Sequence, residues 1–330
     1  MRLWALSEGD PMGDEVLYAF RAVGMLDFDE ANEQTTPLEW FDPLVQSSDR
    51  VPEAYAIGTG IPQWTRLSFH DHPPLVFLIQ HIFMRLFGES TFVFRLPSAL
   101  FGIASVYLLF LIGRQLFSSE AGLAAAAFGA VNVHLLFVSR LGLQEAYVIF
   151  FLLFVSYLFL RSLQKDIYFI WTGVALGCAF LTKYTTFILA PIFLVYLLLY
   201  RRDILFNKKL WIGACVAIIL FSPVVVYNIQ LYRAVGHFDF QISHVFGQDP
   251  TIWQIAPGKE IGTLTSRIKE FLPAFFGANS WFFGVLALTS LFFLRSAFLW
   301  LLIGFLAILI VAVIGPSARF LAMLTPALIL

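Results

Sequence analysis

The sequence predicts an all-α membrane protein: a polytopic bundle of transmembrane helices with a small extracytoplasmic cap of loops and interfacial helices. Composition is the first observation behind this prediction. Of 330 residues, 59% are hydrophobic and only 13% are charged, and the mean hydropathy is +0.80. A soluble domain carries about a quarter charged residues, so much of this chain cannot face water. The net charge of −1 gives no reason to expect a nucleic-acid partner.

The second observation is a series of charge-free windows that begins after residue 95. A helix needs roughly 17–25 residues to cross the hydrocarbon core, and most windows reach that length once flanking polar side chains snorkel. We therefore predict a transmembrane bundle over residues 96–330, with about eight full spans and one truncated span, and we expect a sequence that is cut at both ends. The windows are 96–113, 121–139, 146–160, 167–182, 184–200, 210–232, 271–294, 296–318 and 320–330.

The third observation is the placement of lysine and arginine. Alternate short connections hold eight basic and three acidic residues, as cytoplasmic loops should. The other connections then lie outside, and they include residues 1–95, the 140–145 turn and the outer loop at 231–270. Residues 1–95 form the predicted extracytoplasmic first loop and hold 14 of the 22 acidic residues. Within it we predict that the short apolar stretch 73–88 lies in the membrane interface, because a span there would move every later loop to the opposite side.

Two adjacent carboxylates, Asp14 and Glu15, stand in this first loop, followed by Tyr18. A carboxylate near the membrane surface can act as a general base or as a metal ligand. The same pair also suits a helix start, with Asp14 as the N-cap and Glu15 near the positive helix end. Both interpretations stay open from the residues alone.

A histidine-rich segment, His70-Asp71-His72-Pro73-Pro74, follows in the same loop. His-x-His beside an aspartate suggests a divalent metal, and a further ligand could come from the outer loop, for example from His244. Such residues before two prolines also commonly form a turn that begins the next helix.

Four further charged residues fall on the predicted outer side. Arg140 and Glu145 flank one turn, where they can anchor helix ends or meet substrate. Lys183 separates two short apolar windows. It can bind an anionic lipid headgroup, or it can be a lysine at a tight turn whose side chain snorkels to the interface. Arg319 follows a late span. Cations and carboxylates on one membrane face are the groups needed to move a sugar from a phosphate, namely a base for the acceptor and positive charge for the leaving anion.

The order of these motifs resembles a known family. Asp-Glu-x-x-Tyr, His-Pro-Pro-Leu, Arg-Leu-Pro-Ser-Ala-Leu-Phe-Gly, Ser-Arg-x-x-x-x-Glu, Leu-Thr-Lys and Arg-Phe-x-x-x-x-x-Pro are similar to the protein O-mannosyltransferase and aminoarabinose-transferase-like group of GT-C glycosyltransferases. The resemblance implies a polyprenyl-phosphate sugar as donor. It also implies action on the periplasmic, extracellular or lumenal face, which agrees with the side assigned from charge.

The resemblance implies roles for individual residues. Asp14 matches the proposed catalytic base, with Glu15 completing the acidic pair. Asp71 matches the acidic position before the proline motif, and Glu145 matches a second outer-loop carboxylate. These four are the expected catalytic residues.

The remaining matches concern binding. Lys183 matches a cation proposed to hold the lipid phosphate, and Arg319 matches a basic residue after a late span. His244 matches a residue seen near a metal in one branch of the family, and Asp71 is a possible second ligand, so a divalent metal is an expected but not required cofactor. His72 stands where the aminoarabinose branch has lysine, which argues against that sugar. The expected substrate and lipid-phosphate contacts are thus Lys183, Arg140, Arg319, Tyr18 and His72.

These residues lead to one functional hypothesis and two alternatives. The hypothesis is inverting transfer of a sugar to an acceptor hydroxyl on a lipid, a glycan or a protein, at the outer face of a prokaryotic plasma membrane. The first alternative is a transporter or flippase for a lipid-linked sugar, which should carry charges near the bilayer midplane. The second is a non-catalytic membrane subunit. If the transferase hypothesis holds, Asp14, Asp71, Glu145 and Lys183 should converge at one outer cavity.

Overall fold

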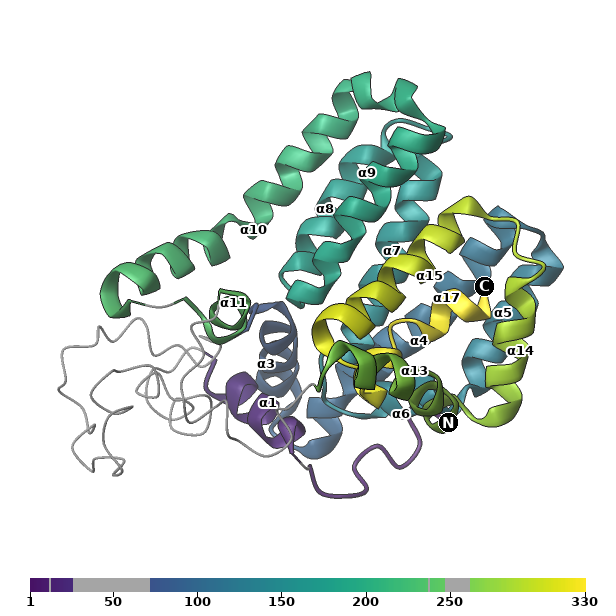
Figure 1. Cartoon of the computed structure of the whole chain (residues 1–330). Helices are drawn as coiled ribbons and strands as arrows, with labels where there is room; N and C mark the ends of the chain where they lie inside the picture. The colour runs from purple at the N-terminus through teal and green to yellow at the C-terminus, as the bar shows by residue number, and fades with distance from the viewer. Residues whose placement is uncertain (12, 26–71, 237, 247–261) are drawn as a thin grey trace, which may run out of the picture.

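The computed structural model describes residues 1–11, 13–25, 72–236, 238–246 and 262–330, and every regular element in those residues is helical (Figure 1). The predicted all-α class is therefore confirmed. The elements are α1 (Asp14–Val23), α3 (Leu75–Phe87), α4 (Thr91–Leu116), α5 (Ser119–Val131), α6 (Val133–Arg140), α7 (Glu145–Ser162), α8 (Tyr168–Phe180), η5 (Tyr184–Ile188), α9 (Leu189–Tyr200), η6 (Arg202–Phe206), α10 (Lys208–Val235), α11 (Phe240–Val245), α13 (Leu264–Asn279), α14 (Trp281–Leu291), α15 (Ala297–Ile308), the π-helix η7 (Leu309–Ile314), α16 (Ala318–Leu321) and α17 (Thr325–Ile329).

Four helices of the described residues are long and apolar enough to cross a membrane: α4, α7, α10 and the continuous α15–η7. The number rises to six if two bent helix pairs each count as one span. Shorter apolar helices cover Leu75–Phe87, Tyr168–Phe180 and Tyr184–Tyr200. Since length and composition alone define these candidates, the full count of eight spans and the sides of the loops stay predictions.

Two predicted windows differ from a single continuous helix. Window 121–139 becomes α5 and α6, which meet at 59°, and window 271–294 becomes α13 and α14, which meet at 119°. At the first break, Asn132 has extended backbone and its side chain accepts a hydrogen bond from Leu135 N, so it begins a new helix. At the second, Ser280 has φ 73°, which is incompatible with a right-handed helix. Charge-free windows do not reveal such breaks.

Helix α7 lies at the centre of the bundle. It packs against α4, α6, α8 and α9, and its aromatic residue Phe159 stacks on Phe193 of α9 with ring centroids 4.1 Å apart. Helix α10 packs along α8 through two glycines, because a Cβ on Gly173 would lie 2.0 Å from the Gly213 carbonyl oxygen. Close backbone contact through small residues is typical of helix packing in membranes.

The N-terminal residues run across the same end of the bundle as α1. Three arginines hold this segment by donating to backbone carbonyls. Arg2 donates to Gly129 and Ala130, Arg95 to Leu6, Glu8 and Gly9, and Arg140 to Met1, Trp4 and Ala5. Helix α1 then packs on α3, and α3 on α4. The predicted helix over 73–88 is thus present as α3, and it supports the helix that begins at Asp14.

Candidate active site

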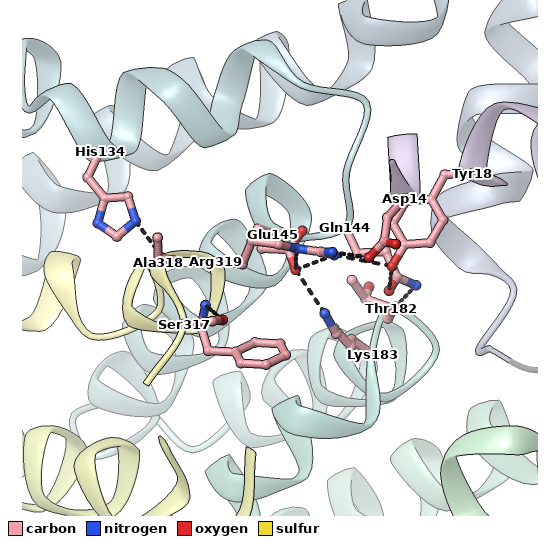
Figure 2. Close-up of polar contacts among 11 residues, drawn as sticks. Asp14, Tyr18, His134, Gln144, Glu145, Thr182, Lys183, Ser317, Ala318 and Arg319 are labelled. Atoms are coloured by element: carbon pink, nitrogen blue, oxygen red, sulfur yellow. Dashed lines mark hydrogen bonds and ion pairs between the residues drawn. The ribbon is translucent and has the colours of Figure 1, made fainter. Parts of the chain in front are cut away.

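Arg319 is the centre of a charged cluster at one end of the bundle (Figure 2). Its guanidinium donates to Glu145 Oε1 through Nη2 at 3.0 Å and through Nε at 3.1 Å. It also donates through Nη1 to Asp14 Oδ2, and its Nη2 lies 3.3 Å from the Tyr18 hydroxyl. Arg319 therefore joins three elements that are distant in sequence, namely α1, α7 and its own helix α16.

Lys183 enters the cluster from the opposite side of Glu145. Its Nζ lies 2.9 Å from Glu145 Oε1, and both side chains are buried. The ammonium also lies 5.2 Å from the centroid of the Phe320 ring, within the range of a cation–π contact. One carboxylate oxygen thus accepts hydrogen bonds from two cations, which is a strong, charge-assisted arrangement.

The helix termini explain why the carboxylates lie here. Asp14 and Glu145 are the first residues of α1 and α7. A helix N-terminus carries partial positive charge, so it favours a carboxylate at that position. Gln144, one residue before α7, is fully buried and donates to Thr182 O at 3.1 Å. Because the Tyr18 hydroxyl also contacts Gln144 Oε1 at 3.4 Å, this amide joins the Lys183 turn to α1.

The charged cluster balances two cations, Arg319 and Lys183, against two carboxylates, Asp14 and Glu145. Burial lowers the pKa of the Arg319 guanidinium, but the attraction of the Glu145 carboxylate and of its other partners raises it above its usual value. Arg319 is therefore fully charged. Glu145 Oε2 is buried and has no hydrogen-bond partner among the described residues. Asp14 keeps about half of its side chain exposed, 49%. The site thus combines fixed cations with one carboxylate that an incoming molecule can reach.

Several known proteins are similar to this chain. Residues 71–227 match the family model described as dolichyl-phosphate-mannose-protein mannosyltransferase. Two Bacillus subtilis (strain 168) proteins, "Putative mannosyltransferase YkcB" and "Putative mannosyltransferase YycA", are 28% and 32% identical over 166 and 169 residues. These matches cover 48% and 50% of this chain and 23% and 24% of the relatives. The chain therefore spans about a quarter of the length of these relatives.

Solved structures show the same fold. The crystal structure of ArnT from Cupriavidus metallidurans bound to undecaprenyl phosphate has a TM-score of 0.65 at 16% identity, over 99% of this chain and 56% of that chain. The apo state of the same protein gives a TM-score of 0.60 over the same shares. The fold of the chain is therefore like that of ArnT, and residues 71–227 are similar to the dolichyl-phosphate-mannose-protein mannosyltransferase family.

The structure brings together five of the predicted site residues. They are Asp14, Tyr18, Glu145, Lys183 and Arg319, and they come from three helices, α1, α7 and α16, and from the turn at Lys183. The predicted orientation of the spans places these residues on the outer side of the membrane, so we expected them to lie close together. The catalytic and binding roles of these residues remain predictions.

Two other predicted site residues, Glu15 and Arg140, form contacts outside this cluster. Glu15 forms a buried ion pair with Arg95, at 2.6 Å from Nε and 2.8 Å from Nη2, and also accepts from Gly142 N at 2.7 Å. Successive helical residues point about 100° apart, so Asp14 and Glu15 face different partners. Arg140 donates to three carbonyls of the N-terminal segment. These contacts hold the N-terminal part of the chain in place, and the catalytic role expected of Glu15 and the substrate contact expected of Arg140 stay predictions.

Of the predicted histidine and metal-site residues, the described part of the chain includes the side chain of His72 but not those of Asp71 and His244. The His72 ring lies 5.7 Å from the Tyr18 ring and 6.1 Å from the Phe77 ring, so it borders the cluster. Asp71 lies outside the described residues. His244 falls in α11, but its side chain is outside the described part. Within that part, no group of three metal-binding side chains is close enough to hold an ion. The metal site of Asp71 and His244 stays a prediction.

One polar group at the site was missed by the sequence reasoning. His134 Nε2 lies 2.7 Å from the carbonyl oxygen of Ala318, the residue before Arg319 (Figure 2). The signal was present, because a histidine inside an otherwise apolar window is unusual in a membrane protein and commonly functional.

Proposed function

We propose that this chain is a membrane glycosyltransferase that moves a sugar from a polyprenyl-phosphate donor to an acceptor hydroxyl, on the extracytoplasmic face and with inversion at the anomeric carbon. The observation that carries the proposal is the bridge formed by Arg319 between Asp14 and Glu145. It sets an exposed carboxylate directly beside a cation, as a transfer from phosphate to hydroxyl requires.

The proposed reaction uses Asp14 as the general base. Its carboxylate accepts the proton of the acceptor hydroxyl while that oxygen attacks the anomeric carbon. The bond from that carbon to the phosphate oxygen breaks, and the lipid phosphate leaves with the electron pair. The transition state resembles an oxocarbenium ion, as in glycoside chemistry. No acid is needed for the leaving group, because a phosphate is already a good one.

Lys183 and Arg319 are the proposed binding groups for the leaving phosphate. An ammonium carries three donors and a guanidinium five. Lys183 uses one donor on Glu145, which leaves donors for a phosphate oxygen. Glu145 holds both cations in place, since its Oε1 accepts from each of them. The structural likeness to ArnT, which was solved with undecaprenyl phosphate, supports a polyprenyl phosphate as the lipid part of the donor.

The acceptor and the sugar are left open in this proposal. The family matches name mannose-protein transfer and the solved neighbour is ArnT, so relatives differ in substrate. A panel of radiolabelled polyprenyl-phosphate sugars, each incubated with membranes that contain the protein, would identify the donor. A divalent metal, if the reaction needs one, would be revealed by chelation with EDTA and readdition of the ion.

The decisive variant is Asp14→Asn, which removes the proposed base and keeps the side-chain volume. We expect it to abolish transfer while the protein remains inserted at the wild-type level. Asp203→Asn is a matched control, because Asp203 also pairs with an arginine but lies in an exposed turn on the predicted cytoplasmic side. Full activity in Asp14→Asn would remove Asp14 from this role. A flippase would move the labelled donor across the membrane of a vesicle without forming a glycosidic bond, so product analysis separates the two functions.

A further inference from the structure

A buried polar network lies behind the charged cluster, where the two bent helix pairs meet. Its four side chains are at most 6% exposed, and they come from the first turn or cap of α6, the end of α13 and the start of α17: Asn132, His134, Asn279 and Thr325. Asn132 is the cap at the α5–α6 break, and Asn279 directly precedes Ser280 at the α13–α14 break. Both breaks are therefore joined by one set of hydrogen bonds.

The orientation of the two asparagine amides in this network follows from the backbone N–H of Leu135, which can only donate. Asn132 Oδ1 accepts from Leu135 N, so Asn132 Nδ2 is the group that donates to Asn279 Oδ1 at 3.2 Å. Asn279 therefore turns its Nδ2 toward His134 Nδ1, at 3.1 Å. Thr325 Oγ1 lies 3.2 Å from Asn279 Oδ1, 3.3 Å from His134 Nδ1 and 3.3 Å from Leu321 O, so its hydroxyl can donate to any of these three acceptors.

His134 must then carry its hydrogen on Nε2. A carbonyl oxygen can only accept, and His134 Nε2 lies 2.7 Å from Ala318 O. The tautomer that donates to Ala318 is also the one whose Nδ1 accepts from Asn279, so the ring is held from both sides. A ring held in one tautomer and one orientation is a precise anchor for the chain that it contacts.

The anchored chain is the short helix that carries Arg319. Helix α16 has only four residues, Ala318–Leu321, and a helix of this length has almost no stability of its own. Its position must come from tertiary contacts. His134 holds its first carbonyl on one side, and the Arg319 side chain reaches Asp14 and Glu145 on the other (Figure 2).

We propose that His134 is a positioning residue, which orients Arg319 toward both carboxylates by holding the Ala318 carbonyl. Its effect on catalysis rests on the proposed glycosyl transfer. A misplacement of about 1 Å at a catalytic group can lower a rate by roughly 100-fold, so a hydrogen bond that fixes the backbone beside Arg319 controls the rate without touching substrate.

A matched pair of variants separates positioning from simple filling of the core. In His134→Gln the terminal amide nitrogen extends about as far as Nε2 and can still donate to Ala318 O. In His134→Asn the amide ends at the position of Nδ1, so it keeps the contact with Asn279 and loses Ala318. We expect His134→Gln to retain transfer within about threefold. We expect His134→Asn to lower kcat by roughly 10-fold to 100-fold, with KM for the donor changed much less.

Hydrogen exchange supplies a readout that does not depend on transfer. Amides of residues 318–324 should exchange faster in His134→Asn than in wild type and in His134→Gln, with the amides of α4 unchanged. If wild-type protein forms no product with any donor, the proposed function fails while the exchange pattern still decides the positioning role. Equal transfer and equal exchange in the two variants would overturn it.

A measurement without any change at His134 covers the case in which both variants fail to insert. With ¹⁵N-labelled histidine, the Nε2 resonance of His134 should shift between wild-type protein and Arg319→Ala, because Arg319 and His134 hold the same four-residue helix. Arg201→Ala is the control, since it removes an exposed arginine that pairs with Asp203 and leaves both α16 and the network in place. An unchanged Nε2 resonance in Arg319→Ala would contradict the proposal.

Discussion

Arg319 and Asp14 are 305 positions apart in the chain, yet the arginine guanidinium donates directly to the aspartate carboxylate. The first helix of the described residues and one of the last are thus joined at the candidate active site. Because Arg319 also donates to Glu145, a single planar group fixes the distance between the two carboxylates. A guanidinium suits this task, since its donors diverge in a fixed geometry.

Arg319→Lys should therefore lose transfer although it keeps the positive charge. An ammonium cannot present the forked donors that contact Asp14 and Glu145 at the same time. We expect the rate to fall by roughly 100-fold, the range seen when one preorganised donor of a catalytic site is removed. Transfer of labelled sugar by membranes with equal amounts of each protein would measure the change. Arg201→Lys, in an exposed pair with Asp203, should leave the rate unaltered.

The pair Glu145–Lys183 makes a prediction about stability. Both side chains are buried, so Glu145→Gln leaves the Lys183 charge without its carboxylate partner, and removal of one partner of a buried pair costs roughly 3–5 kcal/mol. The double variant Glu145→Gln/Lys183→Met should regain much of the loss, because no unpaired ammonium remains, but it should not regain transfer. Thermal unfolding in detergent and the transfer assay test the two halves. A double variant less stable than either single variant would contradict this account.

Part of this site could be predicted from the sequence because membrane topology constrains it. Alternate turns of a polytopic bundle lie on the same side, so the positive-inside distribution was enough to group Asp14, Glu145, Lys183 and Arg319 at one end. Their contacts in the structure agree with that grouping. The helical class followed from composition for a similar physical reason, since a segment in lipid must satisfy its own backbone hydrogen bonds.

Other features could not be predicted, since they depend on rotation and on breaks of helices. Neighbouring carboxylates on one helix look alike in sequence, and only the packing of α1 decides that Asp14 meets Arg319 while Glu15 meets Arg95. The bend at Asn279–Ser280 lies inside an uncharged window, so hydropathy has no signal for it. The contact from His134 to Ala318 spans 184 positions, a separation over which a single sequence gives no pairing signal.

The two adjacent carboxylates of α1 should behave oppositely when neutralised. Glu15→Gln weakens a buried pair with Arg95, an arginine that also holds three carbonyls of the N-terminal segment, so we expect lower stability and less inserted protein. The molecules that do insert should transfer sugar at a rate near that of wild type. Asp14→Asn should show the reverse, with normal insertion and no transfer. Quantifying protein by immunoblot and dividing the rate by that amount distinguishes the cases; a loss of rate per molecule in Glu15→Gln would show that Glu15 acts in catalysis.

The contact between α8 and α10 gives a prediction far from the charged cluster. Gly173→Ala would place a Cβ 2.0 Å from the Gly213 carbonyl oxygen, a backbone atom that cannot move away alone, so the two helices must separate. Overpacking of this kind costs roughly 1–3 kcal/mol. Gly304→Ala in α15 is the matched control, because no atom lies within 4 Å of the added carbon and alanine favours the helix by about 1 kcal/mol. Thermal unfolding in detergent should show a loss for the first variant and none for the second.

Separation of α8 and α10 in Gly173→Ala should also change the charged cluster, because α10 contacts the turn that carries Lys183. Asn228 of α10 donates to Asp239 Oδ2 at 2.8 Å, and that oxygen also accepts from the Tyr184 hydroxyl at 2.5 Å. Tyr184 directly follows Lys183, so movement of α10 shifts the turn that places the Lys183 ammonium on Glu145. We therefore expect Gly173→Ala to lower transfer per inserted molecule as well as stability. Wild-type transfer by a destabilised Gly173→Ala protein would show that the α10 contact and the Lys183 turn move independently.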